Sequence, residues 1–298
     1  MRTIKLSSED RVFFAINYIF LTCAFVVVAF PLLYILANSF SDPAAVIAGR
    51  VWIFPVGFSL KGYKAVFENN YIISGYSNAI YYTVVGTLLN LVMTTFAAYP
   101  LARKRFKFKN YAMFFFAFTM FFGGGLIPLY LLIKDLGLIN TRAVMIIPGA
   151  ISVYNMIIMR TYFQANIPDE MLESAQLDGC SDIKFLYHIV IPLSKAILAV
   201  MVLFYAVGHW NAYFDALLFL NSKDKYPLQL ILREILVLNS IDASMLAGVT
   251  LQELEARLGM KDLLKYSLIV VASVPVLVMY PFVQKYFVQG VMIGAVKG

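Results

Sequence analysis

The stretch ESAQLDGCSDIKFLYHIVIP, residues 173–192, is a polar interruption in a chain that otherwise consists largely of apolar runs. It contains two short helical patterns that meet at Gly179. Glycine is the usual residue where a helix ends in the left-handed conformation. Ser181 is a suitable N-cap for a second helix, with Asp182 in its first turn. The pattern therefore predicts two short helices joined by a sharp bend at Gly179.

The first of these helices is predicted to start at Pro168, because proline suits a first helical position. Asp169 and Glu170 then lie in the first turn, where the helix dipole favours negative charge. The second helix is predicted to place its apolar residues on one face as far as Pro192. These residues are Ile183, Leu186, Ile189 and Val190.

The composition of the chain predicts an all-α membrane protein. Of its 298 residues, 61% are hydrophobic and 14% are charged, so the chain is more apolar and less charged than an ordinary soluble domain. A membrane-spanning helix needs about 20 mostly apolar residues. Six such stretches predict six transmembrane helices in a single domain over residues 1–298, at about 12–37, 76–102, 111–133, 143–159, 196–220 and 266–284.

The first apolar stretch is too long for the apolar region of a signal peptide, and no small-residue cleavage pattern follows it. We therefore expect it to be retained as a helix. The run Gly123-Gly124-Gly125 lies inside the third predicted helix, where it is expected to permit close packing or a bend.

The positions of lysine and arginine predict the orientation in the membrane. Short loops rich in these residues stay in the cytoplasm. The densest group lies between the second and third predicted helices and consists of Arg103, Lys104, Arg105, Lys107 and Lys109. Counting helices from this loop places both termini and the loop 164–194 in the cytoplasm, and the loop 222–265 on the opposite side.

The loop 164–194 is predicted to bind a soluble protein. Helices that lie flat on lipid carry lysine and arginine on their polar face. The polar positions here instead carry carboxylates, with Lys184 as the one cation among Asp169, Glu170, Glu173, Asp178 and Asp182. A short amphipathic helix of this kind fits a groove on a partner, and lipid binding is the alternative.

Catalysis, metal binding and nucleic-acid binding are not predicted. The phosphate-binding motif GxxxxGK[ST] is absent from the sequence. Cys23 and Cys180 give neither a disulfide framework nor metal spacing, and His188 and His209 form no catalytic constellation. The cations behind the net charge of +7 mostly lie at the ends of apolar runs, as expected for anchoring to membrane lipid.

Residues 173–192 resemble the EAA signature of binding-protein-dependent ABC importer permeases, written E-A-A, three residues, G, nine residues, I, any residue, L-P. Every interval of the signature matches. The chain departs from it with Ser174 in place of alanine and Ile191 in place of leucine. The positions that carry the resemblance are Glu173, Ser174, Ala175, Gly179, Ile189 and Pro192.

The resemblance extends over nearly the whole chain. The ending QKYFVQGVMIGAVKG is similar to that of sugar-importer permeases of the maltose-permease type. FFGGGLIPLYLLIKDLGLINT and IPDEMLESAQLDGCSDIKFL look most like the subfamily that imports complex oligosaccharides, including acidic ones of the aldouronate type. The resemblance implies a carbohydrate importer with a type I ABC importer permease fold in the bacterial cell membrane. A permease of the same architecture for a non-sugar solute, or an uncoupled channel, is the alternative.

The resemblance also implies partners. These are a homologous second permease subunit, two cytoplasmic ATPase subunits that bind ATP and Mg, and an extracytoplasmic solute-binding protein. The chain itself would be a transport subunit, not an enzyme, and would bind no cofactor. The residues implied to couple it to the ATPase are Glu173, Ser174, Ala175, Asp178, Gly179, Ile189 and Pro192.

The fifth predicted helix holds a candidate translocation path. Polar side chains within a span normally face the bundle interior or a water-filled route. Asn211 and Asp215, four residues apart, would share a helical face, and Trp210 and Tyr213 would offer aromatic faces to a sugar ring. The same pattern fits a structural pair between helices, and the sequence leaves both interpretations open.

Overall fold

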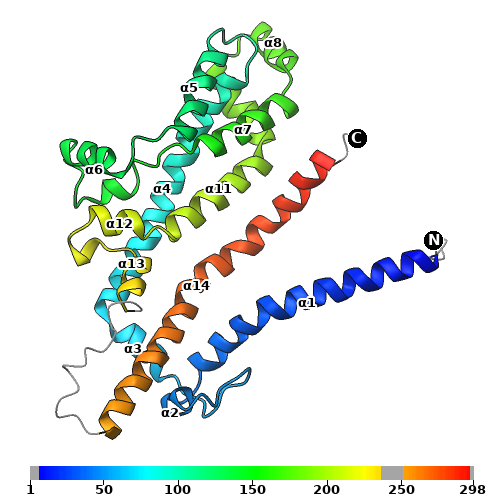
Figure 1. The fold of residues 1–298 in the computed structure, drawn as a ribbon. Coiled ribbons are helices and arrows are strands. Elements are labelled where there is room, and N and C mark those ends of the chain that lie inside the picture. The colour runs from blue at the N-terminus through cyan, green and yellow to red at the C-terminus, as the bar shows by residue number, and fades with distance from the viewer. Residues whose placement is uncertain (1–6, 236–250, 296–298) are drawn as a thin grey trace. The chain divides into compact units, whose positions relative to one another are not determined.

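A computed structural model describes residues 7–235 and 251–295 of the chain, and its regular structure within them is entirely helical (Figure 1). Part of the predicted loop 222–265, residues 236–250, lies outside this description. Contacts divide the chain into two units, Met1–Asn69 with Ile235–Ser273 and Asn70–Glu234 with Val274–Gly298. The long helix α14, Leu251–Ala295, contributes residues to both units.

The first unit contains α1 (Ser8–Ser39), α2 (Pro43–Ile47), α3 (Lys61–Glu68) and the first part of α14. Ser7 and Asp10 form a capping box that starts α1. The apolar span of α1 is exposed along its length within this chain, and α1 becomes buried only at its end. In this unit, Gly62 of α3 packs directly against Leu263 and Ser267 of α14.

The second unit is built on α4 (Asn70–Ala102), against which α7 (Val153–Asn166) and α11 (Lys195–Trp210) pack. Their contact buries an apolar core that includes Ala98, Met156, Phe163 and Met201. A second core lies nearer the start of α4 and includes Tyr82 of α4, Phe219 of α12 (Phe214–Phe219) and Leu230 of α13 (Leu228–Arg233). The remaining elements of this unit are α5 (Lys109–Phe121), α6 (Leu126–Asp135), η1 (Arg142–Met145) and η3 (Lys223–Lys225).

The predicted spans 12–37, 76–102 and 266–284 fall inside the continuous helices α1, α4 and α14. Within the described ranges, three helices are long and apolar enough to cross a membrane, or up to five if each of two bent pairs counts as one span. By the length and composition of the described helices alone, the count of candidate spans therefore stays below the predicted six.

The predicted third span, 111–133, is broken into α5 and α6, which meet at 113°. The break contains the three consecutive glycines, and Gly125 adopts φ +86°, a conformation that glycine accepts without steric cost. The glycine run thus ends a helix and redirects the chain.

The predicted fourth and fifth spans are also discontinuous. In 143–159, the regular helix α7 starts only at Val153, after Pro148, which has no N–H and disfavours helix in the preceding residue. In 196–220, α11 ends at Trp210 and α12 starts at Phe214. The backbone N–H and the side-chain Nδ2 of Asn211 both donate to Val207 O, at 3.1 and 2.9 Å, where α11 ends.

Candidate functional site

Residues 164–194 fold into a helical hairpin between α7 and α11 (Figure 1). It consists of α8 (Asp169–Leu177), α9 (Asp182–Phe185), the π turn η2 (Leu186–Val190) and α10 (Ile191–Leu193). The direction changes by 83° where Asp182–Leu193 meets Lys195–Trp210. The predicted pair of short helices is confirmed, with Pro168 as N-cap of α8 instead of its first helical residue.

The bend between α8 and α9 is made by Gly179. This residue has φ +77°. Its N–H donates to Gln176 O at 3.0 Å, and the N–H of Cys180 donates to Ala175 O at 2.9 Å. These are the two hydrogen bonds of a Schellman motif. The motif fixes the interval of four residues between Ala175, which supplies the acceptor carbonyl, and the glycine that must be left-handed.

The need for glycine at position 179 comes from the backbone and not from crowding. A Cβ atom placed there would meet nothing within 4 Å. Any L residue with a side chain would nevertheless pay for the left-handed conformation. The bend thus depends on backbone freedom at a single residue.

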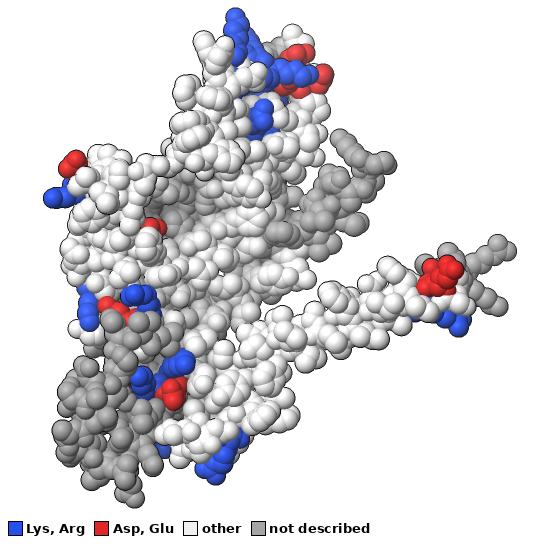
Figure 2. Space-filling model, in the orientation of Figure 1, with Lys and Arg blue, Asp and Glu red and all other residues white. Residues whose placement is uncertain are grey.

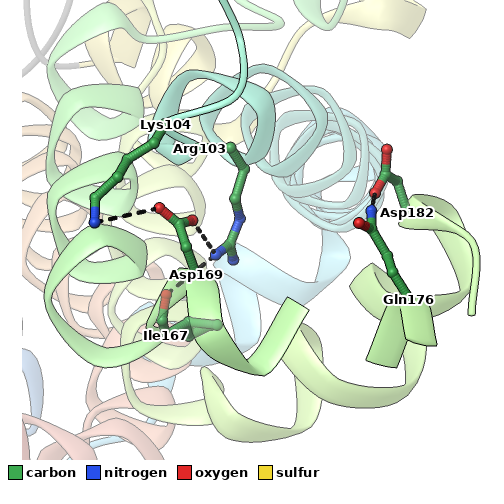
Figure 3. Close-up of polar contacts among 6 residues, drawn as sticks. All are labelled: Arg103, Lys104, Ile167, Asp169, Gln176 and Asp182. Atoms are coloured by element: carbon green, nitrogen blue, oxygen red, sulfur yellow. Dashed lines mark hydrogen bonds and ion pairs between the residues drawn. The ribbon is translucent and has the colours of Figure 1, made fainter. Parts of the chain in front are cut away.

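One glutamine links the two helices of the hairpin across the bend. Gln176 in α8 donates through Nε2 to Asp182 Oδ1 in α9 at 3.0 Å (Figure 3), and its Oε1 accepts from Arg105 Nη1 at 3.3 Å. Ser181 caps α9 by accepting from the N–H of Lys184 at 3.4 Å, as predicted. Of these contacts, the hydrogen bond between Gln176 and Asp182 joins α8 directly to α9.

The inner face of the hairpin belongs to the core of the second unit. Leu172 of α8 and Phe185 of α9 are buried with Leu186 and Val190 in the cluster formed by α4, α7 and α11. The predicted apolar face of the second helix was wrong in one position, because Ile183 is 65% exposed. The π turn that follows α9 changes the helical register, so a period of 3.6 residues does not hold across it.

The outer face of the hairpin combines exposed apolar and acidic side chains. The exposed apolar ones are Met171, Leu177, Ile183 and Tyr187, and Leu177 is 90% exposed. The exposed carboxylates are Glu170, Glu173, Asp178 and Asp182. In Figure 2, acidic side chains at the α8 end of the molecule lie beside a group of lysine and arginine side chains. Apolar anchors with a polar rim are typical of surfaces that bind proteins.

The cationic loop after α4 meets the start of the hairpin (Figure 3). Arg103 is buried, and its Nη1 donates to Ile167 O at 3.1 Å and to Asp169 Oδ1 at 3.3 Å. Lys104, which is exposed, pairs with Asp169 Oδ2 at 3.8 Å. Sequence reasoning used these cations only to orient the chain and missed this contact. The available signal was the group of cations in one loop and the group of carboxylates in loop 164–194, because both loops were predicted to lie on the same side of the membrane.

The candidate path residues do not lie together on one helix. Asn211 follows the last residue of α11, whereas Asp215 lies in the first turn of α12. The prediction that they share a helical face was therefore wrong, because it assumed an unbroken helix through residues 211–213. Both side chains are exposed within this chain.

The aromatic candidates also differ in their surroundings. Trp210 is buried and packs edge-on against Tyr76 of α4, with ring centroids 5.6 Å apart. Tyr213 is exposed and lies beside Phe214. Trp210 thus packs between helices, while Tyr213 has a free surface within this chain.

Two polar contacts between α4 and α11, one buried and one partly buried, were not identified from the sequence as pairs. His209 Nε2 and Asn90 Oδ1 are 2.6 Å apart, and Asn90 Nδ2 donates to Gly149 O at 2.6 Å. The hydroxyls of Thr94 and Tyr205 are 2.6 Å apart. Their residues are far apart in sequence, so periodicity within one span carries no signal for these pairs.

Comparison with known proteins adds three findings. Residues 71–293 match the family described as binding-protein-dependent transport system inner membrane component. The chain is 40% identical over 298 residues to Protein LplC of Bacillus subtilis (strain 168), covering 100% of this chain and 99% of that protein. It is 36% identical over 293 residues to the polygalacturonan/rhamnogalacturonan transport system permease protein YtcP of the same organism, covering 97% and 100%.

A solved structure is also similar to this chain. It is described as the crystal structure of a bacterial ABC transporter involved in the import of the acidic polysaccharide alginate. The match has a TM-score of 0.87 and 34% sequence identity, and it covers 96% of this chain and 100% of that chain.

Proposed function

The chain belongs to the family of binding-protein-dependent transport system inner membrane components, and we propose that its α8–α9 hairpin couples an ATPase to the import of an acidic oligosaccharide. It is a multi-pass permease subunit of an ABC importer for carbohydrate and not an enzyme. ATP is hydrolysed by other subunits, and a solute-binding protein delivers the sugar.

The acidic substrate is proposed from the relatives. YtcP is named for polygalacturonan and rhamnogalacturonan, and the solved transporter is described as importing alginate. Both descriptions name polymers that contain uronic acids. A neutral oligosaccharide, or a non-sugar solute carried by the same architecture, is the alternative.

The observation that carries the coupling proposal is the two-sided construction of the hairpin. Its inner face is part of the core of α4, α7 and α11, while its outer face presents Leu177 and Glu173 to solvent. A protein that binds the outer face and moves would therefore move helices of the bundle. Apolar anchors such as Leu177 suit a groove on the ATPase, and the carboxylates around it favour a basic rim there.

The remaining signature residues act through this geometry. Ala175 supplies the carbonyl of the Schellman motif and Gly179 the left-handed bend, with Asp178 exposed beside it. Ile189 and Pro192 lie where the hairpin turns toward α11, and Ser174 is exposed on α8. In this proposal they set the shape of the hairpin more than they touch the ATPase.

We also propose six membrane spans with both termini in the cytoplasm. The α7 helix has 14 residues, or about 21 Å at 1.5 Å per residue, which is short of a membrane core of about 30 Å. Residues 142–152 would complete this span. Irregular backbone is tolerated at membrane depth where protein surrounds it, and Val144, Met145 and Ile146 are buried.

A homologous second permease subunit completes the proposed importer. The apolar span of α1 is exposed in this chain and leaves a surface for lipid and for such a subunit. The loop 222–265, on the opposite side from the hairpin, would face the solute-binding protein. The path residues Asn211, Asp215, Trp210 and Tyr213 are proposed to lie near the sugar route, with Trp210 in a packing role.

The function is tested by purifying the chain from its host with its partners. We expect an ATPase, a second permease and a solute-binding protein to accompany it. The binding protein should bind oligogalacturonate or oligoalginate more tightly than neutral oligosaccharides of the same length in calorimetry. Preference for a neutral sugar would contradict the acidic substrate, and a chain that moves solute without an ATPase would contradict the coupling.

The docking surface is tested with Leu177→Asp. An interface hot spot contributes at least about 2 kcal/mol, so this variant should lower the affinity for the ATPase by roughly thirtyfold. The measurement is the amount of ATPase that co-purifies per permease. Leu136→Asp, at a 61% exposed leucine outside the hairpin, is the matched control. Native ATPase recovery with Leu177→Asp would refute the proposed surface.

A further inference from the structure

Arg103 is the first residue after α4, and only 6% of its side chain is exposed. Arginine is rarely buried so completely unless it is paired. The neighbouring cations of the same loop, Lys104 and Arg105, are exposed. One arginine of the cationic loop therefore has a different role from the others.

The contacts of Arg103 join three helices. Its Nη1 donates to Ile167 O and Asp169 Oδ1, which lie on either side of the residue that caps α8. Its guanidinium carbon lies 5.0 Å from the ring centroid of Tyr99 in α4 and 5.6 Å from that of Phe185 in α9. One planar group thus contacts α4 and both helices of the hairpin.

Stability alone does not account for an arginine here. Burying an ion pair among apolar side chains often contributes no more than packed apolar residues of the same volume would. Two nitrogens of Arg103, Nε and Nη2, are buried without a hydrogen-bond partner in the part of the chain that the structure describes. Burying the guanidinium therefore costs free energy. What the arginine adds over an apolar residue is hydrogen bonds of fixed direction to Ile167 and Asp169.

Two other polar contacts join the loop after α4 to the hairpin, Lys104 with Asp169 at 3.8 Å and Arg105 with Gln176 at 3.3 Å, but both cations are exposed. Leu172 and Phe185 meet Ala98 and Leu101 in an apolar cluster, and apolar contact is non-directional. The hairpin continues directly into α11 along the chain, whereas α5, α6 and α7 separate it from α4 in the sequence. Movement of the hairpin would shift α11 directly, whereas α4 needs a fixed contact to follow.

We propose that Arg103 is a positioning residue that fastens the hairpin to α4, so that one movement of the hairpin displaces α4 and α11 together. The inference rests on the proposed function of the hairpin. Arg103 would touch neither the sugar nor the ATPase. Its removal should leave ATPase binding intact and should lower the amount of sugar transported per ATP.

The test uses the complete importer in proteoliposomes with its solute-binding protein. Arg103→Met keeps a long side chain, removes both hydrogen bonds and leaves Asp169 paired with Lys104. Arg103→Lys keeps the charge but not the planar fork or the ring contacts. The matched control is Lys104→Met, which removes the exposed partner of the same carboxylate. The readout is imported oligogalacturonate per ATP hydrolysed.

We expect Arg103→Met to assemble and hydrolyse ATP while this ratio falls at least roughly fivefold, the lower end of coupling between sites. Arg103→Lys should lie between Arg103→Met and the native importer, and Lys104→Met should be native. A residue that only supports folding would lower the yield of complex without changing the ratio. A native ratio in Arg103→Met overturns the proposal. If Arg103→Met does not assemble, a native ratio in Arg103→Lys overturns it and a lowered one supports it.

A second readout separates this inference from the proposed function. Spin labels at Phe96→Cys in α4 and Lys184→Cys in α9, both exposed, report the distance between these helices after Cys23 and Cys180 are replaced by serine. We expect a narrow distance distribution in the native complex with and without ATP, and a broader one in Arg103→Met. Equal distributions would overturn the inference, whereas failure of the native complex to import oligogalacturonate would affect only the proposed substrate.

Discussion

Substitution of Gly179 isolates the contribution of the hairpin bend. Since a Cβ atom there would meet nothing within 4 Å, the cost of a side chain is the cost of φ +77° alone. For a non-glycine residue this is about 1–2 kcal/mol, and it is greater for β-branched residues. An energy of this size changes an equilibrium between two local conformations by roughly 5–30-fold. Gly179→Val should therefore favour a hairpin with a different angle.

The expected order of activity follows from the tolerance for the left-handed region. Asparagine visits this region more readily than other side chains, so Gly179→Asn should transport nearly as well as the native importer. Gly179→Ala should be intermediate, and Gly179→Val should hydrolyse ATP with little transport. The assay is imported sugar per ATP hydrolysed by the complete importer in proteoliposomes.

The control for this series is Gly49→Val. Gly49 has φ +64° and open space for a Cβ, but it lies in the first unit, outside the hairpin. This variant carries the same backbone strain and should leave the transport ratio unchanged. Normal transport by Gly179→Val would refute the argument. Equal loss in Gly179→Asn and Gly179→Val would also refute it, because the defect would then follow the presence of a side chain and not the backbone angle.

Two further predictions concern the contact between α4 and α11. A Cβ at Gly86 would overlap the His209 ring, which is held by its contact with Asn90, so Gly86→Ala should destabilise the complex by about 1–3 kcal/mol. Thermal unfolding in detergent measures this loss, and Gly208→Ala, at a helical glycine with open space, should not share it. Asn90→Leu removes the partner of His209 Nε2 and of Gly149 O. It should lower the free energy of unfolding by about 1–3 kcal/mol for each group. An unchanged melting temperature would contradict this prediction.

The hairpin was predictable from the sequence because its determinants are local. A Schellman motif spans six residues, and its glycine is the position that sequence reasoning selects first. The cap at Ser181 and the acidic first turn of α8 depend on neighbouring residues in the same way. The error at Ile183 arose because a π turn follows its helix and shifts the register of the later apolar residues, and the composition of the segment does not indicate a π turn.

The breaks in the spans were harder to predict from the sequence. Apolar composition predicts that a segment lies in lipid, but it does not predict whether the helix is continuous. The glycines at 123–125 and Pro148 carried a signal for the first two breaks, whereas Asn211 gave only a weak one. The buried role of Arg103 could not be read from its loop, since four of its neighbours within six residues are also cations. It is distinguished by its burial and by the carbonyl, the carboxylate and the Phe185 ring that the hairpin brings to it.

The position of α4 explains why its attachment to the hairpin matters. At one end, Arg160 Nε donates to Leu101 O at 2.9 Å, which ties α7 to α4 beside Arg103. In the first half of α4, Asn78 Nδ2 donates to Asp224 O at 2.7 Å and Tyr82 Oη donates to Lys225 O at 2.8 Å.

The helix has 33 residues, about 50 Å at 1.5 Å per residue, and these two sets of directional hydrogen bonds lie roughly 35 Å apart along it. A displacement that enters at the hairpin would reach the turn at 223–225, on the proposed outer side. Coupling between two binding sites is reciprocal. If α4 carries the movement, docking of the binding protein must also change the affinity of the hairpin for the ATPase, and Arg103→Met should weaken both effects together.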